Sequence, residues 1–110
     1  MEYNLITKGK IFNPVEISEY STGGIVSHQI LSKEIGNISL FTFDKGQKLS
    51  EHSAPFDALV QVLEGEVEVN IDRKPLILKA GDMVIMPANI PHSVNAISKF
   101  KMILTMIKGE

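Results

Sequence analysis

The sequence predicts an all-β domain, either a sandwich or a barrel, and three observations lead to this prediction. Short apolar runs are separated by turn residues roughly every ten positions along the chain. The clearest of these runs alternate apolar and polar side chains, as half-buried strands do. No window of a dozen or more residues repeats its apolar residues with the period of a helix.

Size and composition restrict the classes of function. The chain has 110 residues, which is enough for a single domain with a substantial core. Its net charge is −2 and it has no basic block, so we expect neither nucleic acid nor a membrane as a partner. It has no cysteine, which excludes disulfides and thiolate chemistry. Without a secretory signal or a membrane-spanning run, the protein is expected to be cytoplasmic.

The first third of the chain has the weakest pattern. We expect residues 1–24 to form one or two short edge strands ahead of a barrel at 25–107, because Pro14 interrupts the apolar pieces and proline cannot donate to a central ladder. A short helix in this region is the alternative. Strands are expected next at 25–31 and at 38–43, and the latter has so few polar side chains that both of its faces are expected to be covered.

The pattern is clearest in the second half of the chain. In the strand expected at 66–71, every second side chain is apolar, namely Val67, Val69 and Ile71. The glutamates between them are better explained by a solvated strand face than by a cation site. The remaining elements are, in order, a hairpin turn at 72–75, a strand from Leu76, a turn at 79–82, a short buried strand at 83–86, a loop at 87–91 and strands at 92–97 and 100–107.

Two stretches place a histidine among turn residues at fixed spacing. The first begins at Gly46 and ends at Gly65, and the second begins at Gly81. The motif positions that agree are Gly46, His52 and Gly65 in the first, and Gly81, Pro87 and His92 in the second. They resemble the cupin motifs G-x5-H-x-H-x(3,4)-E-x6-G and G-x5-P-x-G-x2-H-x3-N. The resemblance covers roughly residues 38–107 and implies a small double-stranded β-helix, a jelly-roll barrel of the RmlC-like kind, with an internal pocket.

The departures from these motifs concern the metal. In metal-binding cupins, two histidines and a glutamate of the first motif and the histidine of the second hold a divalent ion. Here the second histidine position is Ala54 and the glutamate position is Ala58. The resemblance therefore leaves His52 and His92 as metal ligands, for Zn, Ni, Mn or Fe, or implies no metal at all. Asn89 replaces a motif glycine, a mild change because asparagine tolerates a left-handed backbone.

A third metal ligand would have to come from another side chain. The candidates are Asp57, Gln61, His28 and Asn95. Strand parity points Asp57 and Gln61 away from the face of Ala58 unless a bulge intervenes. His28 is more simply explained as a surface residue of its strand. Two imidazoles alone make a weak site, since catalytic zinc usually keeps three protein ligands.

The two motif histidines are also the candidates for contact with a ligand. His52 and His92 are expected to line a pocket, and they are the catalytic candidates of an enzyme, because imidazole transfers protons near neutral pH. We expect Gln61, Met86 and Met102 to complete the pocket. Its apolar part favours a small molecule with a hydrophobic or planar portion.

Three functions stay open at this point. The first is a small-molecule-binding or sensory module with little or no metal, which the two alanines favour. The second is a metal-dependent cupin enzyme, either an isomerase, a decarboxylase or a dioxygenase, although fold alone does not specify chemistry. The third is a structural role through a dimer face, and we expect a homodimer in any case. The sequence identifies no substrate.

Overall fold

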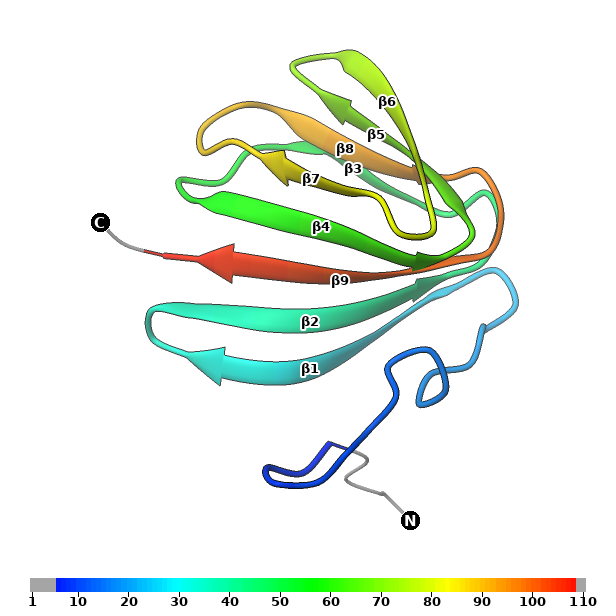
Figure 1. Ribbon diagram of the computed structural model, residues 1–110. Helices are drawn as coiled ribbons and strands as arrows, with labels where there is room; N and C mark the ends of the chain where they lie inside the picture. The colour runs from blue at the N-terminus through cyan, green and yellow to red at the C-terminus, as the bar shows by residue number, and fades with distance from the viewer. Residues whose placement is uncertain (1–5, 109–110) are drawn as a thin grey trace.

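The computed structural model describes residues 6–108 and contains two facing β-sheets (Figure 1). The strands are β1 (Ile25–Lys33), β2 (Gly36–Phe43), β3 (Lys48–His52), β4 (Asp57–Glu64), β5 (Glu66–Ile71), β6 (Lys74–Lys79), β7 (Met83–Met86), β8 (His92–Ala96) and β9 (Phe100–Ile107). The larger sheet has the order β1-β2-β9-β4-β7 and the smaller one the order β3-β8-β5-β6. The all-β jelly-roll prediction is confirmed. Within 6–108, no helix is long and apolar enough to cross a membrane.

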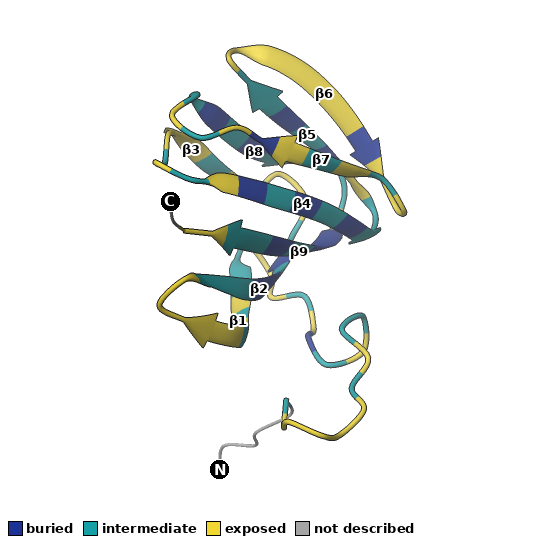
Figure 2. Cartoon of the chain, turned by 60° about the vertical axis from the view of Figure 1, so that its left-hand side comes forward, coloured by how far each residue is buried: buried dark blue, intermediate teal, exposed yellow. Residues whose placement is uncertain are grey.

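Strand register separates an inner from an outer face of each sheet. In the larger sheet Val60 lies opposite Leu104 and Val62 opposite Met102, and all four side chains are buried. Figure 2 shows the result along β4, where buried and half-buried residues alternate. Because successive side chains of a strand point to opposite faces, the alternation read from the sequence becomes one apolar layer between the sheets.

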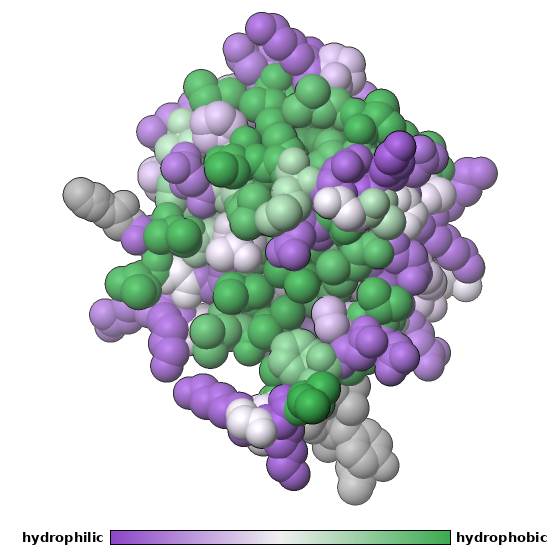
Figure 3. All heavy atoms as spheres, in the orientation of Figure 1, coloured by the Kyte–Doolittle hydropathy of each residue, from purple (hydrophilic) through white to green (hydrophobic). Residues whose placement is uncertain are grey.

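The outer face of the larger sheet is also rich in apolar side chains (Figure 3). At its edge, β7 exposes 53% of Met83 and 59% of Ile85, while Met86 points inward and is 3% exposed. The expectation of a buried strand at 83–86 was therefore wrong for two of its side chains. The reason is alternation: Met83 and Ile85 lie on the outer face of β7, and Val84 and Met86 lie on its inner face.

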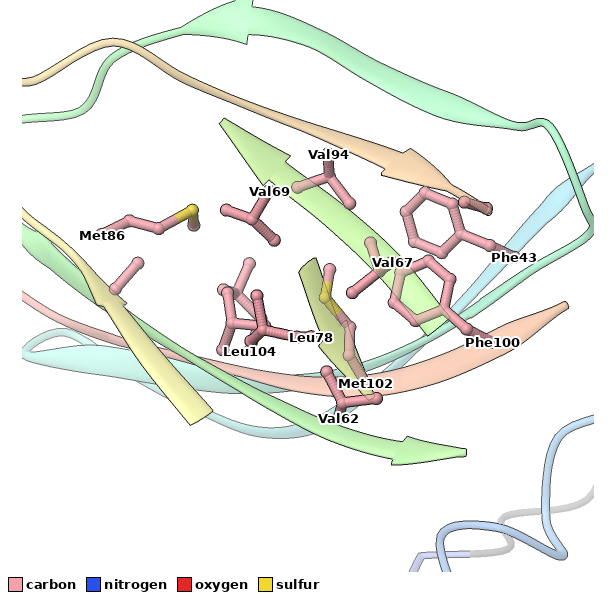
Figure 4. Packing of buried hydrophobic residues seen from close by; sticks show 13 residues of the cluster. Phe43, Val62, Val67, Val69, Leu78, Met86, Val94, Phe100, Met102 and Leu104 are labelled. Atoms are coloured by element: carbon pink, nitrogen blue, oxygen red, sulfur yellow. The ribbon is translucent and has the colours of Figure 1, made fainter. Parts of the chain in front are cut away.

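At one end of the barrel, two aromatic rings meet in the core. The ring centroids of Phe43 and Phe100 lie 4.6 Å apart, and neither side chain is exposed. Figure 4 shows this pair at the opposite end of the interior from Met86, with Val67 and Met102 beside it. We call this the closed end of the barrel.

Two turns explain why particular residues stand between strands. Gly65 joins β4 to β5 with φ of 83°, and a Cβ atom there would lie 2.0 Å from the carbonyl oxygen of Lys99. Only glycine fits that position. Asp72 and Arg73 have φ of 54° and 63°, as in the two-residue turns favoured by hairpins. The hairpin turn is thus shorter than the predicted 72–75, and Pro75 lies in the edge strand β6.

The N-terminal segment differs from the prediction. Residues 6–24 contain turns and no strand, and residues 1–5 lie outside the described residues. The backbone N–H groups of Glu16 and Ile17 donate to the carbonyl of Asn13, at 3.0 and 3.1 Å, so local turns use groups that an edge strand would have paired. The buried ammonium of Lys101 donates to the carbonyl of Ser18 at 2.7 Å and to that of Val15. These bonds fasten the segment to the outer face of the larger sheet.

Candidate functional site: a small cavity beside a histidine pair

The interior opens at the end of the barrel opposite the aromatic pair. A cavity of about 50 Å³ lies there, and we call it the histidine cavity. The residues that line it are Leu49, His52, Ala54, Ala58, Met86, His92, Val94, Met102, Leu104 and Met106. Three larger hollows, of about 590, 390 and 260 Å³, have no histidine among the described residues that line them. The histidine cavity is therefore the hollow that combines an apolar wall with groups able to do chemistry.

A β-bulge turns His52 into this cavity. Between β3 and β8, Leu49 lies opposite Val94 and His52 lies opposite His92. Three steps along β3 thus correspond to two along β8, which is the register of a bulge. Without it, Leu49 and His52 would point to opposite faces of the sheet. With it, both line the cavity beside His92.

The hydrogen bonds of the two rings define their tautomers. His52 Nδ1 lies 2.8 Å from the carbonyl oxygen of Ser50, and His92 Nδ1 lies 3.2 Å from that of Ile90. A carbonyl oxygen only accepts, so each Nδ1 carries the donated proton. A neutral imidazole has a single N–H, which leaves a lone pair on each Nε2. The two Nε2 atoms are 3.2 Å apart, so when both rings are neutral their lone pairs face the same place.

The environments of the two rings differ. His92 is 5% exposed, whereas His52 lies at the surface side of the cavity and is exposed. Burial lowers the pKa of His92 from its usual value of 6.5, and the neighbouring His52 lowers it further, against a smaller opposing effect of the Ile90 carbonyl. Among residues 6–108, no side chain of a charged residue type lines the cavity. The buried ring is thus held neutral near neutral pH.

Of the four cupin metal-ligand positions, two carry a donor group for a divalent metal in this protein. All four positions that carry metal ligands in the cupin motifs line this one cavity: His52, Ala54, Ala58 and His92. Two nitrogens bound to one tetrahedral ion at about 2.05 Å lie about 3.3 Å apart, close to the observed separation. However, residues 6–108 contain no group of three or more His, Cys, Asp or Glu able to hold a metal. The residues supply two ligands and do not fit a tightly bound ion.

Two of the proposed third ligands on β4 point away from the cavity. Gln61 lies opposite Met83, which is on the outer face, and it does not line the cavity. The inclusion of Gln61 among the pocket residues is therefore not supported, because its odd spacing from Ala58 places it on the other face. The carboxylate of Asp57 accepts a hydrogen bond from the Ala88 backbone at 2.8 Å and so holds the loop before His92.

The other two candidates also lie elsewhere. His28 lies on β1 opposite Leu40 of β2, away from the two motif histidines. Asn95 lies opposite Lys48 on the outer face of the smaller sheet. Neither lines the cavity. Among the predicted pocket residues, the structure does bring Met86 and Met102 together with the two histidines.

Sequence reasoning missed part of the wall. Leu104 and Met106 could have been found, because they share the inward face of β9 with Met102. Val94 could have been found in the same way from its alternation with His92. Leu49 could not, since the bulge that brings it to the same face as His52 has no signature in this sequence.

Comparison with known proteins agrees with this architecture. A two-sheet jelly-roll with its site between the sheets defines a class of small barrel proteins, and residues 39–108 match the model of the family described as "Cupin domain". The chain belongs to the cupin family, as the motif resemblance implied. No curated protein matches it.

Solved structures resemble the whole chain. A conserved protein of unknown function from Streptococcus pyogenes is 32% identical, with a TM-score of 0.91 over 100% of this chain and 97% of that one. A cupin 2 conserved barrel domain protein from Leptotrichia buccalis is 45% identical over 88% of this chain, with a TM-score of 0.85, but the match covers only 47% of that longer chain. A cupin superfamily protein from Desulfitobacterium hafniense, 22% identical with a TM-score of 0.89 over 99% and 100%, shares the fold.

Proposed function

We propose that this protein binds a small molecule in the histidine cavity and that it does so without a tightly held metal. The observation that carries the proposal is the pairing of Ala54 and Ala58 with His52 and His92 around one space. Two positions that hold metal in related motifs have lost their donor groups, while the two that remain still direct lone pairs into the cavity. The four positions therefore give the cavity two hydrogen-bonding side chains and two small apolar ones.

The side chains that line the cavity can rearrange to admit a ligand larger than the empty cavity. Met86, Met102 and Met106 line the cavity, and methionine changes shape more readily than branched side chains do. The apolar body of a ligand would pack against these three, and its polar end would contact the imidazoles. His52 is exposed, so this side of the cavity gives access from solvent.

The metal-dependent enzyme is the second candidate, as an isomerase, decarboxylase or dioxygenase. The observation in its favour is the 3.2 Å separation of the two Nε2 atoms, which suits two ligands of one ion. Water would have to complete the coordination, and the exposed side of His52 would admit it. Since the side chains present supply only two ligands, we derive no reaction step for this candidate.

The test combines metal analysis with ligand binding. For the metal, untagged protein purified without chelator is analysed for Zn, Ni, Mn and Fe beside a His52→Ala/His92→Ala variant. For the ligand, a small neutral alcohol is titrated into the protein while the methionine methyl signals are followed by NMR. We expect little metal in either protein, and alcohol-dependent shifts at the cavity methionines. Ala58→Val, which fills the cavity, is the matched control and should abolish the shifts. Near-stoichiometric metal that disappears in the double variant would instead favour the enzyme.

The expected homodimer belongs to the same proposal. Met83 and Ile85 expose apolar surface on the outer side of β7, and a second copy would cover it. Light scattering at micromolar concentration should give the mass of a dimer, and Ile85→Lys should shift it toward the monomer. A monomeric mass for the unchanged protein would contradict the dimer. The cytoplasmic location stays a prediction.

A further inference from the structure

We infer that the polar end of the ligand is a neutral hydrogen-bond donor, such as a hydroxyl group, and that the cavity rejects groups that only accept. The inference rests on the proposed function, because it names the class of molecule that the same cavity would take. Three features of the cavity lead to it.

The first feature is that both rings are fixed as acceptors. Each Nδ1 faces a backbone carbonyl oxygen, Ser50 for His52 and Ile90 for His92. Moving the proton to Nε2 would set a lone pair against that oxygen and break the bond, and the cost is greater for the part-buried contact of His92 than for the exposed contact of His52. The rings therefore cannot adapt to an acceptor by exchanging tautomers without losing a bond that the fold provides.

The second feature is that the wall offers the rings no other partner side chain. Besides the two histidines, the lining residues are leucine, alanine, methionine and valine, none of which carries a strong donor. A polar group deprived of water and left without a hydrogen bond is destabilised. The cavity has room for a water molecule, which can donate to both rings. A ligand that displaces water has to supply the donor itself.

The third feature is the lack of charged side chains around the pair. No Asp, Glu, Lys or Arg of the described part of the chain lines the cavity. A carboxylate or ammonium group would lose its hydration without gaining a counter-charge, so a full charge is disfavoured at this site. A neutral donor avoids that cost and still satisfies the Nε2 lone pairs. A hydroxyl on a short apolar body meets all three conditions.

Three probes of matched shape test the inference. Isopropanol, acetone and acetate share a skeleton of four heavy atoms but present a donor, a neutral acceptor and a charged acceptor. Protein labelled with 13C in its methionine methyl groups and 15N in its histidines is titrated with each. The signals of Met86, Met102 and Met106 report occupancy whatever the polar group, and the imidazole nitrogens report the tautomer. We expect isopropanol to bind about tenfold more tightly than acetone, with acetate weaker still.

Each outcome decides between defined alternatives. Equal or tighter binding of acetone, or an Nε2–H tautomer at either ring, would overturn the donor inference and leave the small-molecule proposal standing. Tightest binding of acetate would show that the pair carries a proton, which would also overturn it. Failure of every probe to move the methionine signals would remove the proposed function together with the inference.

Two variants serve as controls. His52→Leu/His92→Leu keeps an apolar wall and should bind isopropanol and acetone equally, with methionine shifts retained. If that variant still preferred isopropanol about tenfold, the imidazoles would not be the source of discrimination and the inference would fail. Ala58→Val should lose all three probes. Dispersion of the amide spectrum shows whether each variant is folded.

Discussion

The closed end and the histidine end of the barrel share strand β9 but differ in the size of their inward side chains. At the closed end, β2 and β9 contribute Phe43 and Phe100, whose rings touch and fill the interior. At the histidine end, the corresponding layer includes Ala54 and Ala58, and a cavity remains. The difference teaches that side-chain volume at a few inward positions helps to decide where this protein has room for a ligand.

The largest effect is expected from opening the closed end. Phe100→Ala removes a ring with no exposed surface, and such truncations lower the free energy of unfolding by about 3–5 kcal/mol. Urea denaturation measures the change. Ile77→Ala, at a position 59% exposed, is the control and should cost less than about 1 kcal/mol. A small loss for Phe100→Ala would mean that the two ends are packed alike.

A second change crowds the closed end instead of opening it. Gly65→Ala places a Cβ atom 2.0 Å from the Lys99 carbonyl oxygen and 2.7 Å from the Cβ of Phe100, at a φ of 83°. Backbone strain and overpacking together predict a loss of about 2–4 kcal/mol in the same assay. Gly46→Ala has a similar φ but open space around its Cβ, so it isolates the strain. Equal losses for the two variants would show that crowding by Phe100 contributes nothing.

A third change rebuilds the histidine end as a metal site. Ala54→His/Ala58→Glu restores donors at two positions that already line the cavity with His52 and His92. We expect near-stoichiometric zinc and a stabilisation of about 2.7 kcal/mol when free zinc is a hundred times the dissociation constant. Thermal unfolding with and without zinc measures this. Ala54→His/Ala58→Gln should bind zinc more weakly, and equal binding by the unchanged protein would contradict the proposed loss of the site.

The smallest effect is expected from pH, and only at the histidine end. Because the pKa of folded His92 lies below its unfolded value of 6.5, the unfolded chain binds more protons as the pH falls below that value. Stability should therefore be unaffected by this group above pH 6.5 and should decrease as the pH falls through the folded pKa. His92→Leu should flatten this decrease in urea denaturation at several pH values, and Phe100→Ala should not. A slope unchanged in His92→Leu would remove His92 as its source.

Much of the fold could be predicted from the sequence because local chemistry determines it. Gly65 has the positive φ and close packing that only glycine satisfies, and Asn89 has a φ of 65°, the left-handed conformation expected at its motif position. The prediction of N-terminal edge strands was wrong for the described residues 6–24. Turns after Asn13, together with bonds from a lysine near the other end of the chain, define that segment, and no local pattern encodes such distant partners.

The site could be predicted only in part. Motif spacing correctly brought His52 and His92 together, because the fold delivers those positions to one cavity. It could not reveal the bulge between Leu49 and His52, since one extra residue in a strand register leaves no compositional trace. Nor could it reveal the two carbonyl contacts that determine the tautomers. The prediction that Gln61 lines the pocket was wrong for a simpler reason, because the position of Gln61 along β4 directs its side chain to the outer face.

The attachment of the N-terminal segment through Lys101 has a consequence for where this domain begins. The family match starts at residue 39, yet the carbonyls that accept from the buried ammonium belong to Val15 and Ser18. A protein shortened to the matched region would uncover a lysine that is 5% exposed in the intact fold. It would also remove β1 and the partner of Thr42, whose hydroxyl bonds that of Ser18 at 2.7 Å. The folding unit is therefore longer than the stretch by which its relatives are recognised, and fusions or truncations are best placed before residue 13.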